Sequence, residues 1–222
     1  SQYEPFKTTF IKKYNRSTTY MYYPWPGGLS AVLQQVMLLA LALSFASEFE
    51  NGTFSQLVQK SNSIVQMMSV KIIPYLVMSF GVWLIYWFFT FYFRIPFFTN
   101  LPQLTFVAGI FILSVSFIGI LVSILIPNQL KATEVLMVIA TPSFILSGFS
   151  WPLSQMPNWV QGVANIIPLT HFLKAFRILI IEEGTLSQVQ NPIYNMIIIG
   201  IVCAILSYIA LYFKSKKGLQ ST

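Results

Sequence analysis

Side chains that could do acid–base, nucleophilic or metal chemistry are scarce in this 222-residue sequence, which has one His, one Cys and no Asp. An enzyme active site normally needs such groups at converging positions, and a metal site needs several of them as ligands. No GxxxxGK[ST] phosphate loop occurs, so the usual kind of ATP site is missing. The residues therefore argue against an enzyme, against a metal site and against a cofactor held by this chain.

One stretch concentrates charge and turn-forming residues: SEFENGTFSQLVQKSN, residues 47–62, with Glu48 and Glu50 before an Asn-Gly pair. It follows residues 17–47, which carry no charge. Because Asn-Gly marks a turn, we expect a short helix after Gly52, lying across the membrane face. Its carboxylates would be available to basic residues of a partner. The alternative is an ordinary interfacial loop in which both glutamates are merely solvated.

The composition is that of a membrane protein, with 55% apolar residues, 9% charged residues and a mean hydropathy of +0.68. Several uncharged runs are long enough for the roughly 20 residues that cross a bilayer. These runs cover residues 17–47, 72–93, 95–130, 135–173 and 184–213. We therefore expect an all-α polytopic membrane bundle of about five transmembrane helices, at residues 29–47, 72–93, 104–126, 130–149 and 193–213.

Proline, glycine and charge mark the expected span boundaries. The PWPGG segment that ends residues 1–28 is expected to stop any regular element before the first span. Pro74 falls in the first turn of the second expected span, where a missing N–H costs little. In the fourth, Pro142 predicts a kink, and the spacing of Lys131 and Glu134 predicts an ion pair at the membrane edge.

Residues 150–192 are too polar for a simple span and too apolar for a free loop. Two apolar faces at helical spacing, separated by Pro168, predict a pair of short amphipathic helices in or dipping into the interface. The faces comprise Trp159, Val163 and Ile166, then Phe172, Phe176 and Leu179. His171 has Thr170 beside it but no carboxylate before Glu182. We expect this histidine to be solvated among lipid headgroups.

The net charge of +7 would suggest nucleic acid in a soluble protein. Here the basic residues are scattered between apolar spans, so we expect them to face lipid headgroups and expect no nucleic-acid partner; their distribution does not decide orientation. The spans have no charged residue at midplane depth, as a proton-driven transporter would need. Their polar groups either bond across helices or line a substrate path, and they include Gln34, Gln35, Thr141, Ser143 and Ser147.

Two blocks of the sequence carry a family resemblance. The first contains SEFENGTF and matches a pattern at Glu48, Glu50, Gly52, Thr53, Leu57, Lys71 and Pro74. The second, ILSGFSWPLSQMPNWVQGVANIIPLTHF, matches at Ser147, Gly148, Pro152, Met156, Pro157, Trp159, Pro168 and Phe172. Together they resemble the ABC-type-2 transporter permeases, especially the multidrug-exporter-like branch. The sequence departs from that pattern at Ser47, Asn62 and Val70, where arginine, proline and glycine are usual.

The resemblance implies a topology. The family has six spans, with a large extracytoplasmic segment between the first two in this branch, so this chain would lack the first span and most of that segment. Residues 1–28 would end the extracytoplasmic segment, residues 29–213 would form the ABC-type-2 transmembrane domain, and residues 214–222 would form a cytoplasmic tail. The expected location is the bacterial inner membrane, with the stretch 47–62 as a cytoplasmic coupling helix.

The resemblance also implies a function: the permease subunit of an ATP-driven exporter that moves a hydrophobic or amphipathic substrate out of the cytoplasm by alternating access. The expected partners are a cytoplasmic ATPase subunit that carries ATP and Mg, a second permease copy or paralogue, and membrane lipid, with a periplasmic adaptor as an optional addition. Lipid or polysaccharide export by the same family is the alternative. Two other classes remain, a membrane-embedded lipid-modifying enzyme and a structural membrane subunit.

The resemblance assigns roles to sets of residues. The ATPase-coupling set is Glu48, Glu50, Gly52, Thr53, Leu57 and Lys71. The outer gate is the extracytoplasmic hairpin, with Trp151, Pro152, Met156, Pro157, Trp159 and Pro168. The first and fourth spans of two copies are expected to line the substrate path, and the proposed lining residues are Gln34, Met37, Phe45 and Ser143.

Overall fold

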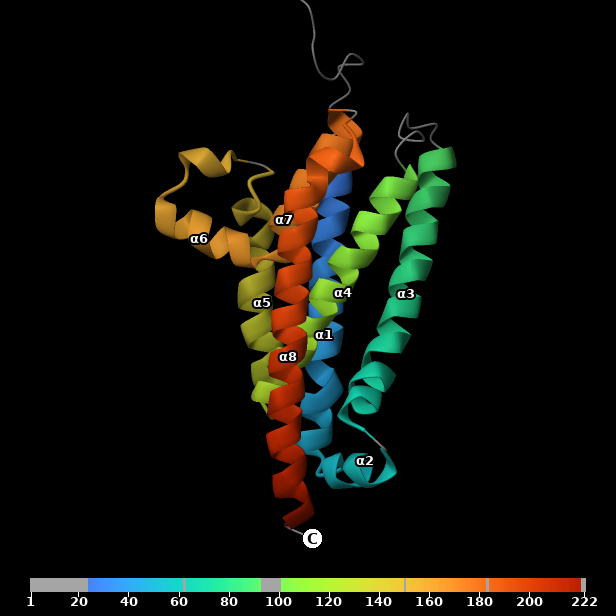
Figure 1. Ribbon diagram of the computed structural model, residues 1–222, viewed down its shortest axis with the longest axis vertical. Helices are drawn as coiled ribbons and strands as arrows, with labels where there is room; N and C mark the ends of the chain where they lie inside the picture. The colour runs from blue at the N-terminus through green and yellow to red at the C-terminus, as the bar shows by residue number, and fades with distance from the viewer. Residues whose placement is uncertain (1–23, 62, 93–100, 150, 183, 221–222) are drawn as a thin grey trace, which may run out of the picture.

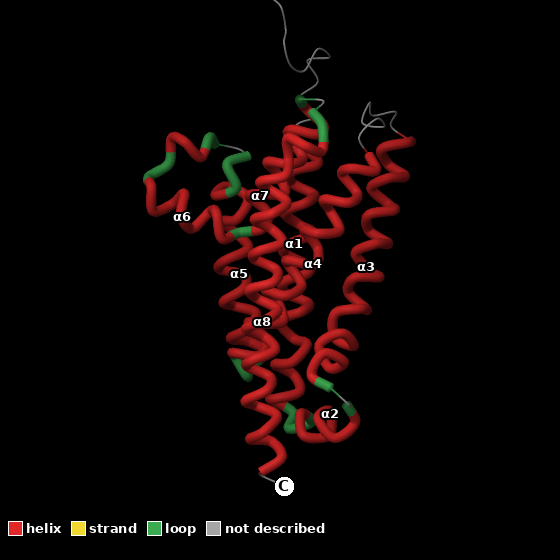
Figure 2. The backbone as a smooth tube through the Cα atoms, in the orientation of Figure 1, coloured by secondary structure: helices red, strands yellow, loops and turns green. Residues whose placement is uncertain are grey.

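A computed structural model describes residues 24–61, 63–92, 101–149, 151–182 and 184–220, and every regular element in these ranges is helical. Five of these helices are long and apolar enough to cross a membrane. They are α1 (Pro24–Glu50), α3 (Ile64–Tyr92), α4 (Leu101–Leu125), α5 (Gln129–Leu146) and α8 (Gln190–Gln220). The all-α membrane bundle expected from the sequence is confirmed (Figures 1 and 2).

Shorter elements lie at the two ends of the bundle. The helix α2 (Phe54–Lys60) lies at the same end as the C-terminal part of α8 (Figure 1). Toward the other end lie α6 (Asn158–Ile166) and α7 (Pro168–Phe176), which continues into a π-helical turn, Arg177–Ile181. The axes of α6 and the α7 segment differ by 88°. This bent pair is the hairpin expected between the fourth and fifth spans.

The first helix begins earlier than expected, because α1 includes the whole PWPGG segment from Pro24. The first N–H groups of a helix have no partner within it, so proline costs little there. Gly27 also fits this place, since a Cβ on it would lie 2.5 Å from Cε1 of Phe149. The expectation that this segment stops the helix was therefore wrong. The residues before Pro24, and the link at 93–100, lie outside the described part.

The second span also begins earlier, at Ile64, where Oγ of Ser63 accepts a hydrogen bond from N of Gln66 at 3.2 Å. Pro74 therefore lies inside α3 rather than in its first turn. Lys71 lies just before the uncharged run 72–93, but its charge is paired with Glu48 and so does not prevent a helix. The hydropathy pattern alone places the start of this helix too late, because it does not show that the charge is paired.

Two other boundary expectations are corrected. Among the described residues, the ion pairs are Lys71 with Glu48 and Arg177 with Glu182, so Lys131 and Glu134 do not form the expected pair. At the other end of the chain, α8 continues to Gln220, into the stretch expected as a tail. The run of basic residues after the last apolar stretch is therefore helical.

The centre of the bundle is formed by α1 and α4, with α5 packed against α1, α8 packed against α4, and α7 buried between α4 and α8. Its largest fully buried side chains include Leu41 and Phe45 of α1 and Phe111 and Ile120 of α4. In contrast, α3 stands at one edge (Figure 1) and exposes most of its apolar side chains. Within a bilayer such a surface contacts lipid or another protein, because no water is available to it.

Small residues bring α4 close to its neighbours, as in other membrane bundles. A Cβ built on Gly119 would lie 2.7 Å from Cβ of Leu41, so α1 and α4 approach closely there. Oγ of Ser123 accepts hydrogen bonds from the backbone N of Phe45 and of Ala46, both at 2.8 Å. The last turns of α1 are thus tied to α4 by a single buried hydroxyl.

Replacing this hydroxyl, Ser123→Ala, is expected to lower the free energy of unfolding by about 1–3 kcal/mol, because two inter-helix hydrogen bonds are lost. The matched control is Ser116→Ala: Ser116 is equally buried, but within the described part of the chain its hydroxyl bonds only to Ile112 O of its own helix. Thermal unfolding of the purified protein in detergent measures both changes. Equal losses in the two variants would contradict the tie between α1 and α4.

Candidate functional site

The acidic turn, residues 48–53, ends α1 in a defined motif. Thr53 N donates to Glu48 O at 3.0 Å, and Gly52 has a φ of +71°. This is the bond pattern of a helix that ends with a left-handed glycine. A Cβ on Gly52 would meet nothing within 4 Å, so its backbone conformation rather than crowding favours glycine there. The sequence therefore ends one span here and starts α2 at Phe54 with a sharp change of direction.

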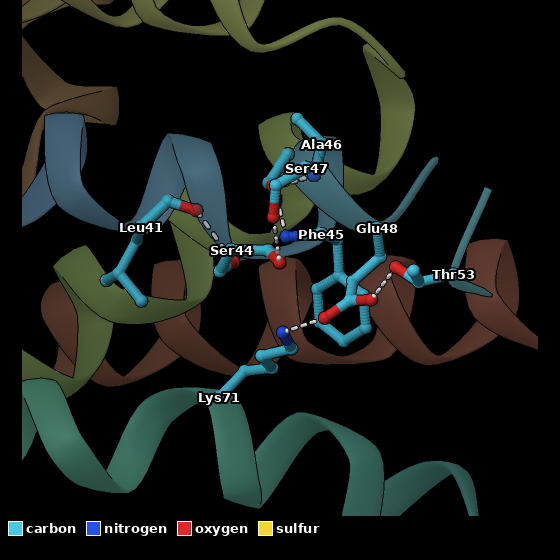
Figure 3. A network of polar contacts seen from close by, with 9 residues as sticks. Leu41, Ser44, Phe45, Ala46, Ser47, Glu48, Thr53 and Lys71 are labelled. Carbon is cyan, nitrogen blue, oxygen red and sulfur yellow. Dashed lines mark hydrogen bonds and ion pairs between the residues drawn. The ribbon is translucent and has the colours of Figure 1, made fainter. Parts of the chain in front are cut away.

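Glu48 is the centre of the polar contacts at this turn (Figure 3). Its Oε1 lies 2.5 Å from Nζ of Lys71 on α3, and its Oε2 accepts a hydrogen bond from Oγ1 of Thr53. Both charged side chains are about one fifth exposed. The carboxylate thus joins the end of α1, the turn and α3. The expectation that this carboxylate is available to basic residues of a partner protein is therefore corrected, because Glu48 is already paired within the chain.

Glu50 makes a second connection, to α5. Its Oε2 accepts a hydrogen bond from N of Gln129 at 2.9 Å, while Oδ1 of Asn128 caps Lys131 N at 2.9 Å. The first N–H groups of a helix carry a partial positive charge, which a carboxylate stabilises. Glu50 therefore ties the end of α1 to the start of α5.

Aromatic and apolar contacts hold α2 in place. The rings of Phe49 and Phe54 lie 4.5 Å apart, Phe54 is buried, and Leu57 is half-buried against the core. The helix packs against α1 and α8. The side chains that α2 exposes are Gln56, Gln59 and Lys60. The face available to a partner is therefore amide-rich and basic rather than acidic.

The predicted coupling residues lie together at this end of the bundle. Thr53 and Lys71 both bond to Glu48, and Gly52 makes the turn. Glu50 joins the turn to α5, and Leu57 packs α2 against the core. Sequence reasoning did not find Lys214, which was expected in a tail. Its Nζ lies 4.0 Å from the centroid of the Phe49 ring and 2.5 Å from Ile124 O. The only signal was its place just after the last apolar run.

The four residues proposed to line a substrate path are core residues of this chain. Gln34, Met37, Phe45 and Ser143 are all less than 5% exposed. Met37 Sδ accepts a hydrogen bond from Ser79 Oγ, which directs it toward α3. They cannot line a path between two copies, so this part of the prediction is corrected. The reason is that α1 is apolar on all sides, and its sequence does not reveal which face is inside.

The exposed side of α1 is a narrow stripe. Val32, Val36 and Leu43 are exposed, and Gln35 is half-buried beside them. The helix α5 packs against α1. Its exposed residues include Val138 and Thr141. If two copies enclose a path, this surface rather than the buried face is the one that can line it.

The hairpin residues predicted as an outer gate differ in their exposure. Trp151, Pro152, Pro157 and Trp159 are exposed, Met156 is half-buried and Pro168 is buried at the first turn of α7. The two apolar faces expected from the sequence separate: Trp159, Val163 and Ile166 are exposed, whereas Phe172, Phe176 and Leu179 are buried. Thus α6 projects an apolar surface outward while α7 is built into the bundle.

His171 is buried, which corrects the expectation of a histidine solvated at headgroups. Its Nε2 lies 2.8 Å from Asn165 O on α6 and its Nδ1 lies 3.4 Å from Nδ2 of Asn195 on α8. A backbone carbonyl and an amide satisfy the ring, and neither is recognisable as a partner from sequence spacing. Among the described residues, no group of three or more His, Cys, Asp or Glu could hold a metal ion.

The model of the ABC-2 family transporter proteins matches residues 1–209. The chain is 27% identical over 195 residues to the Escherichia coli protein named probable multidrug ABC transporter permease YbhR, covering 84% of this chain and 51% of the relative. It is 28% identical over 154 residues to the one named YbhS, covering 68% and 41%.

A more distant relative is ABC transporter G family member 20 of Dictyostelium discoideum, 25% identical over 183 residues, covering 78% of this chain and 24% of the relative. The chain spans about half the length of the first curated relatives it matches. No solved structure matches it. Since the family model matches nearly the whole chain, and the structure has the expected membrane helices, the chain belongs to the ABC-2 family of transporter proteins and is a membrane-embedded permease.

Proposed function

We propose that the chain is the permease subunit of an ATP-driven exporter and that α2 is its coupling helix. A separate ATPase subunit would bind the exposed face of α2, with Gln56, Gln59 and Lys60 at the contact. ATP and Mg would be held by that partner. The acidic turn and the C-terminal part of α8 would face the cytoplasm of a bacterial cell, and the α6–α7 hairpin would face outward as the gate.

The observation that carries this proposal is how firmly α2 is joined to the spans. The Glu48 carboxylate links the turn to α3, Glu50 links it to α5, and Phe54 packs on Phe49 at the end of α1. A force applied to α2 would therefore reach three spans directly. An ordinary solvated loop, the alternative considered from the sequence, would not need its carboxylates to bridge helices.

Export by alternating access would require a second copy or a paralogue, with the exposed stripes of α1 and α5 facing a shared path. That surface is mostly apolar along its length: Gln35 and Thr141 are polar, and Lys131 and Glu134 are exposed in the first turns of α5. A mostly apolar lining favours a hydrophobic or amphipathic substrate. The names of the two Escherichia coli relatives, multidrug permeases, point in the same direction. A periplasmic adaptor would be an additional partner.

Reconstitution tests the proposal. The chain and an ABC ATPase encoded in a neighbouring reading frame are expressed together, purified through a tag on the chain and placed in liposomes. We expect the pair to co-purify, and we expect ATP hydrolysis to rise on adding an exported hydrophobic dye. Failure of the ATPase to bind or to hydrolyse ATP faster with the permease would overturn the proposal.

A further inference from the structure

The last span, α8, is bonded near one end to the acidic turn and near the other end to the α6–α7 hairpin. The proposed function assigns coupling to the first of these parts and gating to the second. The span is one unbroken helix, Gln190–Gln220, and Asn195 and Lys214 lie about 28 Å apart along it at about 1.5 Å per residue. Such a helix transmits displacement along its length because hydrogen bonds join each turn to the next. The contacts at its two ends therefore decide what it could connect.

At the end near α2, the contact is made by Lys214. Its Nζ donates to Ile124 O at 2.5 Å, at the C-terminal end of α4, where free carbonyl groups attract a cation. The same ammonium lies 4.0 Å from the centroid of the Phe49 ring, in cation–π geometry. Phe49 in turn contacts Phe54, the first residue of α2. One lysine thus joins α8 to α4 and to the acidic turn.

At the other end, Asn195 and His171 make the contact. A neutral imidazole satisfies both of its neighbours at once, because Nε2–H donates to Asn165 O while Nδ1 accepts from Nδ2 of Asn195. This arrangement joins α8 to α7 and to the end of α6. The bend of the hairpin is therefore held against α8 by hydrogen bonds from the buried His171 to two exposed residues, Asn165 and Asn195.

Between these ends, α8 is guided along α4. Ser114 Oγ donates to Met196 O at 2.7 Å, and a Cβ on Gly200 would lie 3.1 Å from that same Oγ. The two helices are in close contact here, so α8 cannot move sideways freely. A tilt or axial shift of α8 at one end would therefore displace its other end.

We propose that Lys214 is a positioning residue that couples the acidic turn to α8, and that α8 is the rigid link carrying motion from α2 to the outer hairpin. The inference rests on the proposed function only for the source of the motion. Lys216, the other α8 lysine with a described side chain, lies 4.8 Å from the Tyr212 ring on its own helix. Of the two, Lys214 is the one that reaches other helices.

The test uses the full chain in detergent and needs no ATPase. Lys214→Met keeps an unbranched side chain of nearly the same length and removes its cation. Lys214→Arg restores a cation, and Lys216→Met is the matched control. Hydrogen exchange of the backbone amides is measured at the acidic turn and at the hairpin. In Lys214→Met we expect exchange of the hairpin amides to quicken roughly threefold to tenfold. The other two variants are expected to stay within about twofold of the unchanged chain.

A rise in exchange at the acidic turn alone, with the hairpin unchanged, would show that Lys214 is only a local brace and would overturn the link. Equal effects of Lys214→Arg and Lys214→Met would overturn the role of the cation. If Lys214→Met does not fold, Phe49→Leu provides the second variant, since it removes the ring but leaves the bond to Ile124 O. It is expected to act in the same direction on the hairpin, with smaller amplitude, and no change there would refute the link.

A second measurement separates this inference from the proposed function. A cysteine replaces exposed Val163 on α6, in a Cys203→Ser background, and its rate of maleimide labelling is followed in the complex with the ATPase, with and without ATP. We expect ATP to change the rate in the otherwise unchanged chain and to have no effect in Lys214→Met. If ATP changes neither, ATP coupling itself fails, while hydrogen exchange still decides whether α8 links the two ends.

Discussion

Reversing both charges of the acidic turn, Glu48→Lys with Glu50→Lys, is expected to uncouple ATP hydrolysis from export while the chain remains in the membrane. The first change places two ammonium groups where Glu48 and Lys71 now lie 2.5 Å apart, and the second puts a cation at the positive end of α5. The lost contact of Glu48 with Lys71 is worth about 1.5–3 kcal/mol, and the lost contact of the exposed Glu50 about 0.3–1 kcal/mol. Export of a dye by reconstituted vesicles should therefore fall roughly tenfold or more.

A charge exchange provides the control for this prediction. Glu48→Lys with Lys71→Glu restores an ion pair of opposite direction between α1 and α3, although Thr53 then faces an ammonium instead of a carboxylate. We expect it to recover a substantial part of the export that Glu48→Lys alone removes. Export at the unmodified rate by the double reversal, at equal protein in the membrane, would contradict a role for the turn.

The second large effect is expected for Gly119→Leu. A Cβ at this position would lie 2.7 Å from Cβ of Leu41, so a leucine can enter only if α1 and α4 move apart. Overpacking a dense interface that cannot relax costs about 3 kcal/mol or more. Because α1 carries the acidic turn, we expect loss of folded protein, measured as the monodisperse fraction after detergent extraction.

Gly109→Leu is the matched substitution on the same helix. A Cβ at Gly109 would meet nothing within 4 Å, and the residue is exposed. Leucine also favours a helix over glycine by roughly 0.5–1 kcal/mol. This variant should therefore be as stable as the unchanged chain or more stable. Similar losses at both positions would mean that the contact between α1 and α4 is not the cause.

The number and approximate places of the spans could be predicted, because a bilayer imposes a length and an absence of charge that can be read from the sequence. Helix ends could not be placed as well. Lys71 interrupts an uncharged run but is paired with a residue on another helix, so α3 continues past it. The PWPGG segment contains residues that break a helix interior but are tolerated in its first turn.

The candidate site was predictable only in part. The composition of the acidic turn marks it, but the partners of its carboxylates lie on α3 and α5, distant in sequence. Buried residues of α1 were mistaken for path-lining ones because a helix that is apolar on every side has no amphipathic pattern to show its inner face. The role of Lys214 and the burial of His171 could not be predicted, because their partners include backbone carbonyls, which no residue type reveals.

Site-specific photo-crosslinking tests the central claim, that an ATPase subunit acts on this chain through α2. A photoreactive residue is placed at Gln59, on the exposed face of α2, and in a second variant at Gln155, in the hairpin toward the opposite end of the bundle. We expect a covalent adduct with the ATPase from position 59 and none from position 155. An adduct from position 155 but not from 59, or labelling of position 59 by an impermeant reagent added outside the cell, would contradict it.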